Sequence, residues 1–324
     1  MSVRASELQT RSMAGEGRKP RALNSGSVLM PFAPASPAEF SKVLAGAEEL
    51  RNLGFHVADS TPLTPEGYFA GALTSRRNEL LNELERDDVD ALVAIRGGYG
   101  SNYLLDNLAI ERAHAPKVIL GYSDLTSLQA YLWKQYSWIG FYGPMLAAGL
   151  EAGDGAANGY DRESLLAAVG KTDGGWMLRL RGETLVGGET EGRVLGGCMT
   201  LVETTLGTPW ELDTRGAILL LEDRGMKPWQ VDRALMHLKQ AGKFEGVRGI
   251  VLGEFPDCGP LMSGSATVQD VCRRILGALG VPLVYGAAVG HTARPMLTVP
   301  LGVKAHLRAE AEGQLEILEP AVVP

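Results

Sequence analysis

Three polar side chains of this sequence, a serine, a glutamate and a histidine, each follow an apolar segment, and together they suit nucleophilic catalysis. Ser123 comes after the apolar run 118–120 and Gly121, and before Asp124 and leucines at helical spacing. This pattern predicts a buried strand that turns sharply into a helix, with Ser123 at the corner. Its hydroxyl would then project from the edge of the sheet, and the N–H groups at the helix start would stabilise an anion beside it.

A plain helix cap is the simpler interpretation of Ser123 when this stretch is taken alone. Ser-Asp pairs before an apolar run usually cap a helix. Leu125 also stands where the G-x-S-x-G pattern of hydrolase elbows needs its second glycine. A catalytic role for Ser123 therefore depends on partners elsewhere in the chain.

The candidate acid and base lie in the second half of the chain. The apolar segment 217–221 predicts a buried strand that ends in Glu222 and Asp223, and a buried carboxylate needs a partner. Because side chains alternate along a strand, one acid can face a site while the other anchors its loop. His291 follows Gly290 and precedes small residues, so either ring nitrogen can be presented. Strand-terminal acids and single histidines are often structural, but the order serine, acid, histidine is one that catalytic triads adopt.

A glycine-rich loop, Arg96-Gly-Gly-Tyr-Gly100, follows another predicted strand. Loops at the carboxyl ends of parallel strands bind ligands in α/β folds. The spacing is neither G-x-G-x-x-G nor a Walker motif. A plain tight turn explains one glycine but not three, so we interpret the loop as one whose backbone N–H groups face a substrate oxygen.

The elements that must position these residues form two groups. Strands and helices alternate over residues 23–150, which predicts an α/β domain with a parallel, Rossmann- or flavodoxin-like sheet. Residues 151–175 are rich in Gly, Ala and Asp and predict a linker, although they include a short helical segment. Residues 176–324 predict a mixed α+β, β-rich domain that ends in a hairpin, and residues 1–22 predict a disordered, basic tail.

Composition narrows the class of protein. The length of 324 residues suits two domains, and 45% hydrophobic with 21% charged residues is typical of a soluble globular protein. A net charge of −7 argues against a nucleic-acid partner, and the absence of a long apolar run argues against a membrane. Three widely spaced cysteines without a C-x-x-C pair indicate reduced thiols, and no metal-ligand spacing is present. We therefore expect a cytoplasmic protein without a metal or other cofactor.

Five motifs in this order resemble the LD-carboxypeptidase (muramoyltetrapeptide carboxypeptidase) family of serine peptidases, from about residue 23 to the end. They are Arg96-Gly-Gly-Tyr-Gly100, Gly121-Tyr-Ser-Asp124, Gly207-Thr-Pro209, Leu221-Glu-Asp223 with Asp232-Arg233, and Gly290-His291. The chain departs from the family pattern at Gly26-Ser-Val-Leu29 and Pro34-Ala-Ser36. These differences concern the edges of the first strand and not the triad.

The resemblance implies a role for each candidate site residue. Ser123 would be the nucleophile, His291 the base and Glu222 the residue that orients the base. The oxyanion donors would be the backbone N–H groups of Asp124 and of the turn at Gly97 and Gly98. The implied reaction is hydrolysis of the L,D amide bond that releases terminal D-alanine from a cytoplasmic murein tetrapeptide during peptidoglycan recycling, and the implied assembly is a homodimer.

Several alternatives stay open at this point. A microcin-immunity branch of the same fold cleaves peptidyl or aminoacyl adenylates, and a non-catalytic nucleotide- or sugar-binding α/β module would use no triad at all. Asp223 or Glu254 could hold His291 in place of Glu222. A carboxypeptidase must also pair the terminal carboxylate of its substrate. Arg96, Arg224, Arg233 and Arg294 are the unranked candidates for that pairing.

Overall fold

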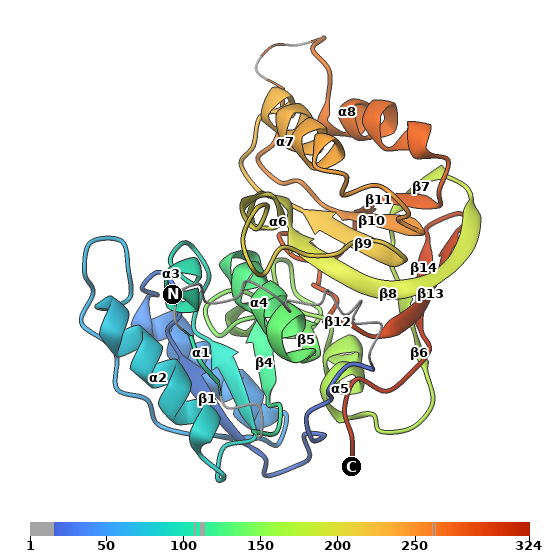
Figure 1. Cartoon of the computed structure of the whole chain (residues 1–324). Helices are drawn as coiled ribbons and strands as arrows, with labels where there is room; N and C mark the ends of the chain where they lie inside the picture. Colours follow the sequence, from blue (N-terminus) through green and yellow to red (C-terminus); the bar gives the residue numbers. More distant parts are fainter. Residues whose placement is uncertain (1–15, 107, 111–113, 261, 263) are drawn as a thin grey trace, which may run out of the picture.

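The first sheet has the parallel arrangement that the alternation of strands and helices predicts (Figure 1). The computed structural model describes residues 16–324 apart from 107, 111–113, 261 and 263. Within these residues the strand order is β12-β5-β4-β3-β1-β2. The strands are β1 (Val28–Phe32), β2 (His56–Val57), β3 (Ala91–Ala94), β4 (Val118–Gly121), β5 (Gly140–Tyr142) and β12 (Val299–Leu301). The strands β1 to β5 pair in parallel, and β12 is antiparallel to β5.

Helices connect the parallel strands. They are α1 (Phe40–Asn52), α2 (Leu73–Glu85), α3 (Asn102–Leu105), the 3-10 turn η1 (Ser123–Leu125) and α4 (Thr126–Tyr136). The helix α1 turns Ala47 and Leu50 inward, as its apolar spacing predicts. Residues 126–132 of α4 are all buried, because this helix contacts β5 on one side and elements of the second sheet on the other. The helix α4, which follows Ser123 and η1, therefore lies between the two sheets.

The second sheet is mixed, which confirms the predicted fold class. Its strand order is β6-β14-β13-β8-β9-β10-β11-β7, with β8 to β11 parallel and the outer pairs antiparallel. The strands are β6 (Trp176–Arg179), β7 (Glu183–Val186), β8 (Gly188–Cys198), β9 (Ala217–Glu222), β10 (Gly249–Gly253), β11 (Leu283–Ala287), β13 (Lys304–Ala309) and β14 (Gln314–Ile317). The remaining helices are η2 (Leu150–Ala152), α5 (Arg162–Gly170), α6 (Met199–Thr204), α7 (Pro228–Gln240), α8 (Val268–Ile275) and η3 (Gly277–Leu279).

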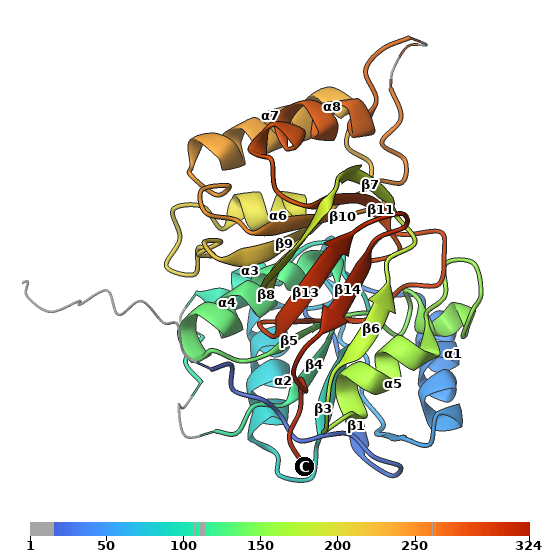
Figure 2. The same cartoon turned by 90° about the vertical axis from the view of Figure 1, so that its right-hand side faces the viewer.

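The central strand β9 separates two hydrophobic cores. Figures 1 and 2 show α7 and α8 over the side of the second sheet that faces away from the first sheet. Leu219 and Leu221 belong to the core beneath these helices, whereas Ile218 and Leu220 belong to the core shared with the first sheet. Side chains alternate along a strand, so Glu222 lies on the same face of β9 as Ile218 and Leu220. Glu222 therefore faces the first sheet.

Residues 16–22 pair with the body of the protein, which corrects the prediction of a disordered tail over this stretch. Arg18 N donates to Ser137 O at 2.7 Å, and Lys19 forms an ion pair with Glu319 at 3.1 Å. The polar composition was a poor guide, because order here comes from hydrogen bonds to distant segments. The rest of the predicted tail lies outside the described residues.

Residues from the end of the chain return to the first sheet. The strand β12 (Val299–Leu301) pairs with β5, although it follows most of the second sheet in sequence. The sequence patterns also missed β7 and α6, which are short. The division of the chain at residues 150 and 175 stays a prediction.

Candidate active site

Ser123 lies at a sharp corner between β4 and η1. Its φ is 63°, a left-handed value that costs a non-glycine residue on the order of 1–3 kcal/mol. The preceding Tyr122 is extended, with φ −141°. This backbone confirms the predicted strand-to-helix turn, and it places Ser123 on the wall of a large cavity.

The glycine-rich loop approaches Ser123 closely enough to require glycine. A Cβ on Gly97 would lie 3.0 Å from Ser123 Cβ and 3.2 Å from Ser123 Oγ. Gly98 has φ +103°, and a Cβ on it would lie 2.4 Å from Ser36 Oγ. Among the described residues, the backbone N–H groups of Gly97, Gly98 and Asp124 donate to no protein acceptor. Gly97 and Gly98 also line the cavity, so their N–H groups are available to an oxygen bound beside Ser123.

A buried network holds this loop in place. Asp124 accepts a hydrogen bond from Ser101 N at 2.7 Å, and Ser101 Oγ donates to Asp124 O at 2.5 Å. The buried guanidinium of Arg76 donates to Gly100 O at 2.9 Å and to Pro34 O at 2.6 Å. The end of the loop at Gly100 and Ser101 is thus fixed to Asp124, the neighbour of Ser123.

His291 is held by Glu222. His291 Nδ1 lies 2.7 Å from Glu222 Oε2, and His291 N donates to the same oxygen at 2.9 Å. The Glu222 side chain is 0% exposed. Burial opposes the charged imidazole, but the charge of Glu222 and its hydrogen bond prevail and raise the pKa of His291 above its ordinary value. His291 Nε2 is the remaining ring nitrogen for proton transfer.

The other two acids are engaged elsewhere. Asp223 accepts from Thr200 N at 2.8 Å and Thr200 Oγ1 at 2.6 Å, and from Arg224 N at 2.7 Å, so it anchors its own loop. Glu254 pairs with the side chain of Arg294. The geometry therefore selects Glu222 as the partner of His291, and the prediction that the two strand-terminal acids divide these tasks fits the observed contacts.

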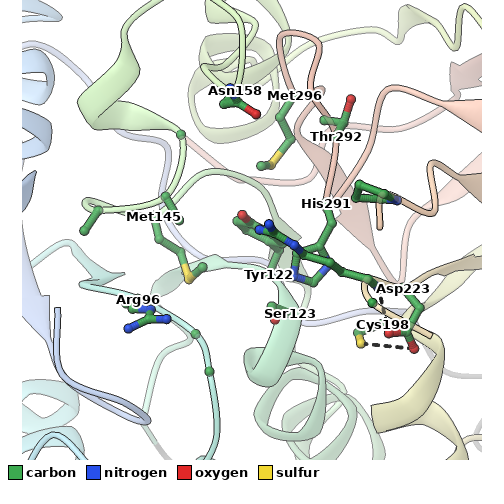
Figure 3. Close-up of a pocket in the computed structure, with 18 of the residues that line it drawn as sticks. Arg96, Tyr122, Ser123, Met145, Asn158, Cys198, Asp223, His291, Thr292 and Met296 are labelled. Carbon is green, nitrogen blue, oxygen red and sulfur yellow. Dashed lines mark hydrogen bonds between the residues drawn. The ribbon is translucent and has the colours of Figure 1, made fainter. Parts of the chain in front are cut away.

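Ser123 follows β4 of the first sheet and His291 follows β11 of the second, and both line one cavity of about 1420 Å³ (Figure 3). In the described structure no hydrogen bond joins Ser123 Oγ to His291. The ring of Tyr122 lies against the imidazole instead, with centroids 5.1 Å apart and planes at 71°. Glu222 and His291 are therefore already paired, and Ser123 lines the same cavity without a hydrogen bond to His291.

The structure shows which of the four candidate arginines line the cavity. Arg96 and Arg224 line the cavity. Arg96 donates to Pro37 O at 3.0 Å, and Arg224 Nε donates to Asp257 at 2.9 Å. Arg294 is engaged with Glu254 and with the backbone oxygens of Arg181 and Gly286, and Arg233 lies over the Trp229 ring, 5.2 Å from its centroid. Only the first two are placed to meet a substrate in the cavity.

The described residues contain neither a metal-ion site nor a membrane-spanning helix. No group of three or more His, Cys, Asp or Glu side chains there is arranged to hold a metal ion. No helix in that part of the chain combines the length and the apolarity needed to cross a membrane. Cys198, Cys258 and Cys272 are free and buried.

Comparison with known proteins decides the family. Residues 31–143 match the family model of the LD-carboxypeptidase N-terminal domain, and residues 191–307 match that of the C-terminal domain. A probable murein peptide carboxypeptidase of Bacillus subtilis is 33% identical over 292 residues, which are 89% of this chain and 90% of the relative. The chain belongs to the LD-carboxypeptidase family.

Two further proteins that resemble this LD-carboxypeptidase are named for different functions. The murein tetrapeptide carboxypeptidase of Pseudomonas aeruginosa is 29% identical over 70% of this chain and 75% of the relative. The structure of MccF, the microcin C7 self-immunity protein of Escherichia coli, in complex with glutamyl sulfamoyl guanosine has a TM-score of 0.84 and 25% identity. That similarity covers 94% of this chain and 99% of MccF.

Sequence reasoning missed one site residue of this LD-carboxypeptidase. The hydroxyl of Tyr142 donates to Glu222 Oε1 at 2.5 Å and accepts from Ser123 N at 3.3 Å. A signal was present, because Tyr142 ends the strand next to the one that leads to Ser123 and the carboxyl ends of parallel neighbours meet.

Proposed function

We propose that this LD-carboxypeptidase hydrolyses the L,D amide bond that precedes a terminal D-alanine in murein tetrapeptides, with Ser123, His291 and Glu222 as its triad. The observation that carries the proposal is the pairing of His291 with a fully buried Glu222 across a cavity from a strained Ser123. The names of the Bacillus and Pseudomonas relatives support the substrate class.

In the proposed reaction His291 Nε2 takes the proton of Ser123 Oγ as that oxygen attacks the scissile carbonyl carbon. Glu222 holds the Nδ1 proton and stabilises the imidazolium. The C–N bond then breaks, and His291 gives its proton to the leaving D-alanine amine. A water attacks the acyl-enzyme in the same way, with His291 as base, and releases the shortened peptide.

Charge on the carbonyl oxygen develops in front of the loop that carries Gly97 and Gly98 and the N–H of Asp124. Such donors act most strongly in sites that exclude water, where losing one costs about 3–4 kcal/mol of transition-state stabilisation. A side chain on Gly97 would collide with Ser123, and one on Gly98 would collide with Ser36. These contacts support the proposed oxyanion role of the loop.

The terminal carboxylate of the substrate lies one carbon from the amine that His291 protonates. Its receptor must therefore lie on the His291 side of the cavity. Arg224 fits this position better than Arg96, because it lines the cavity two residues after Glu222, the residue that holds His291. We assign the carboxylate to Arg224 and the acyl side of the substrate to Arg96.

No hydrogen bond joins Ser123 Oγ to His291 in the described structure, so proton transfer requires these two side chains to approach each other. A hinge in the stretch 151–175 would permit this closure. We extend the proposal to a homodimeric enzyme of cytoplasmic peptidoglycan recycling, which is what the family resemblance implies.

Cleavage of adenylated peptides is the second candidate function, and the similarity to MccF favours it. Purified protein and its Ser123→Ala variant should be incubated with an L,D-tetrapeptide and with an aminoacyl adenylate, and the products read by mass spectrometry. We expect the wild type, but not the Ser123→Ala variant, to release D-alanine from the tetrapeptide. Cleavage of the adenylate only would replace the carboxypeptidase proposal, and no cleavage of either substrate would point to a ligand-binding module.

A further inference from the structure

Tyr142 lies between the backbone of the nucleophile and the carboxylate that holds the histidine. Its hydroxyl donates to Glu222 Oε1 at 2.5 Å, while Ser123 N donates to that hydroxyl at 3.3 Å. Glu222 uses its other oxygen, Oε2, for both contacts with His291. The two oxygens of one carboxylate therefore face different domains.

The position of Tyr142 is fixed by its neighbours. Tyr142 pairs with Gly121 where β4 and β5 end. Gln129 Nε2 of α4 donates to Gly121 O and to Phe141 O, both at 3.0 Å, and so ties the two strand ends together. Tyr142 is 0% exposed. Its hydroxyl cannot move away from Ser123 without disturbing a packed core.

The hydroxyl of Tyr142 keeps its proton at neutral pH. Burial first, and the charge of Glu222 second, raise its pKa well above the ordinary value. A protonated phenol offers one donor and still accepts, which is what its two contacts require. The hydrogen bond to Glu222 withdraws negative charge from that carboxylate and so moderates its attraction for a charged imidazole.

We propose that Tyr142 is a positioning residue, which tunes the Glu222–His291 pair and keeps it in register with Ser123 across the two domains. The inference rests on the proposed function, because it assigns Tyr142 to the same site. Other charged or titratable groups act on this pair and its tyrosine, namely Asp223 and Arg224 on His291 and Cys198 on Tyr142. The Tyr142→Phe substitution leaves those groups unchanged.

The Tyr142→Phe variant removes the hydroxyl alone. Without its second donor, Glu222 stabilises the imidazolium more strongly, so we expect the pKa of His291 to rise by about half a unit to one unit. NMR titration of the imidazole resonances measures this shift directly, with His291→Gln as the assignment control among the five histidines. The acid limb of kcat/KM for D-alanine release should move in the same direction, and kcat should fall about tenfold or more because Ser123 N loses its acceptor.

The matched control is Tyr160→Phe. The buried Tyr160 hydroxyl donates to Glu49 at 2.7 Å, so this variant removes a hydrogen bond of the same kind outside the pair. It should leave the His291 titration unchanged. If Tyr142→Phe does not fold, 3-fluorotyrosine at position 142 keeps the ring and strengthens the donor, and the pKa of His291 should then fall.

An unaltered His291 titration in folded Tyr142→Phe overturns the inference, as does an upward or absent shift with 3-fluorotyrosine. The titration does not depend on turnover. A wild type that releases no D-alanine would therefore refute the proposed function, while the NMR result would still decide the role of Tyr142.

Discussion

Gly290 lies directly against the carboxyl group of Glu222, because a Cβ on Gly290 would stand 2.4 Å from Glu222 Cδ and 2.8 Å from its Oε1. Its φ of +66° also favours glycine. The glycine before His291 is therefore needed to let the acid reach the imidazole. This contact explains in physical terms why glycine and histidine are adjacent at this point of the chain.

Gly290→Ala should displace Glu222 and lower kcat/KM for D-alanine release by about a hundredfold or more, which is the scale of a misplaced catalytic group. Gly286→Ala is the matched control, since Gly286 also has a positive φ (+76°) but open space around its Cα. Both variants should lose about 1 kcal/mol of stability from backbone strain, measured by urea unfolding. Equal activities in the two variants would show that the Glu222 contact is unimportant.

Replacement of Ser123 should separate activity from stability. Ser123→Gly relieves the left-handed strain at φ 63°, so we expect it to abolish turnover while raising the free energy of unfolding by about 1 kcal/mol. Ser137→Gly makes the same change at φ 57° at the end of α4. That control should gain similar stability and keep full activity. A Ser123→Gly protein that still releases D-alanine would exclude Ser123 as the nucleophile.

The pH dependence of activity follows from the His291–Glu222 pair. The base must be neutral to act, and its pKa is raised above the ordinary 6.5. The acid limb of the kcat/KM profile should therefore have its midpoint above pH 6.5. A midpoint clearly below that value would show that another group limits the reaction.

The same shift has a consequence for stability with the opposite dependence on pH. A group whose pKa is higher in the folded state adds stability that is fully present below its unfolded pKa and is lost as pH rises through its folded pKa. Wild type should therefore lose more stability than His291→Gln between about pH 6 and about pH 9. Urea unfolding at the two pH values measures the difference, and parallel losses in both proteins would contradict the proposed ion pair.

Arg224→Gln should weaken recognition of the terminal carboxylate. A charged hydrogen bond is worth about 1.5–3 kcal/mol, so we expect kcat/KM for the natural acid to fall by about 10- to 100-fold. The corresponding peptide with a C-terminal amide should be cleaved almost as well by the variant as by wild type. Arg233→Gln, which lies over Trp229 outside the cavity, is the control and should preserve the preference for the acid. Loss of that preference in Arg96→Gln alone would transfer the role to Arg96.

The local pattern of the chain determined the strands, helices and corners that carry the site. The apolar run before Ser123 and the helical spacing after it predicted the turn that the structure contains. Alternation along β9 predicted that Glu222 and Asp223 take different tasks. These features depend on residues a few positions apart, because the spacing of apolar residues differs between strands and helices.

Only the tertiary structure decided which distant residues meet. Glu222 and His291 are 69 positions apart, and Tyr142 and Glu222 are 80 positions apart. The return of β12 to the first sheet and the docking of residues 16–22 depend on equally remote pairings. Local propensity cannot report such contacts, because any of several acids or arginines satisfies the same local pattern and the packing of two sheets selects among them.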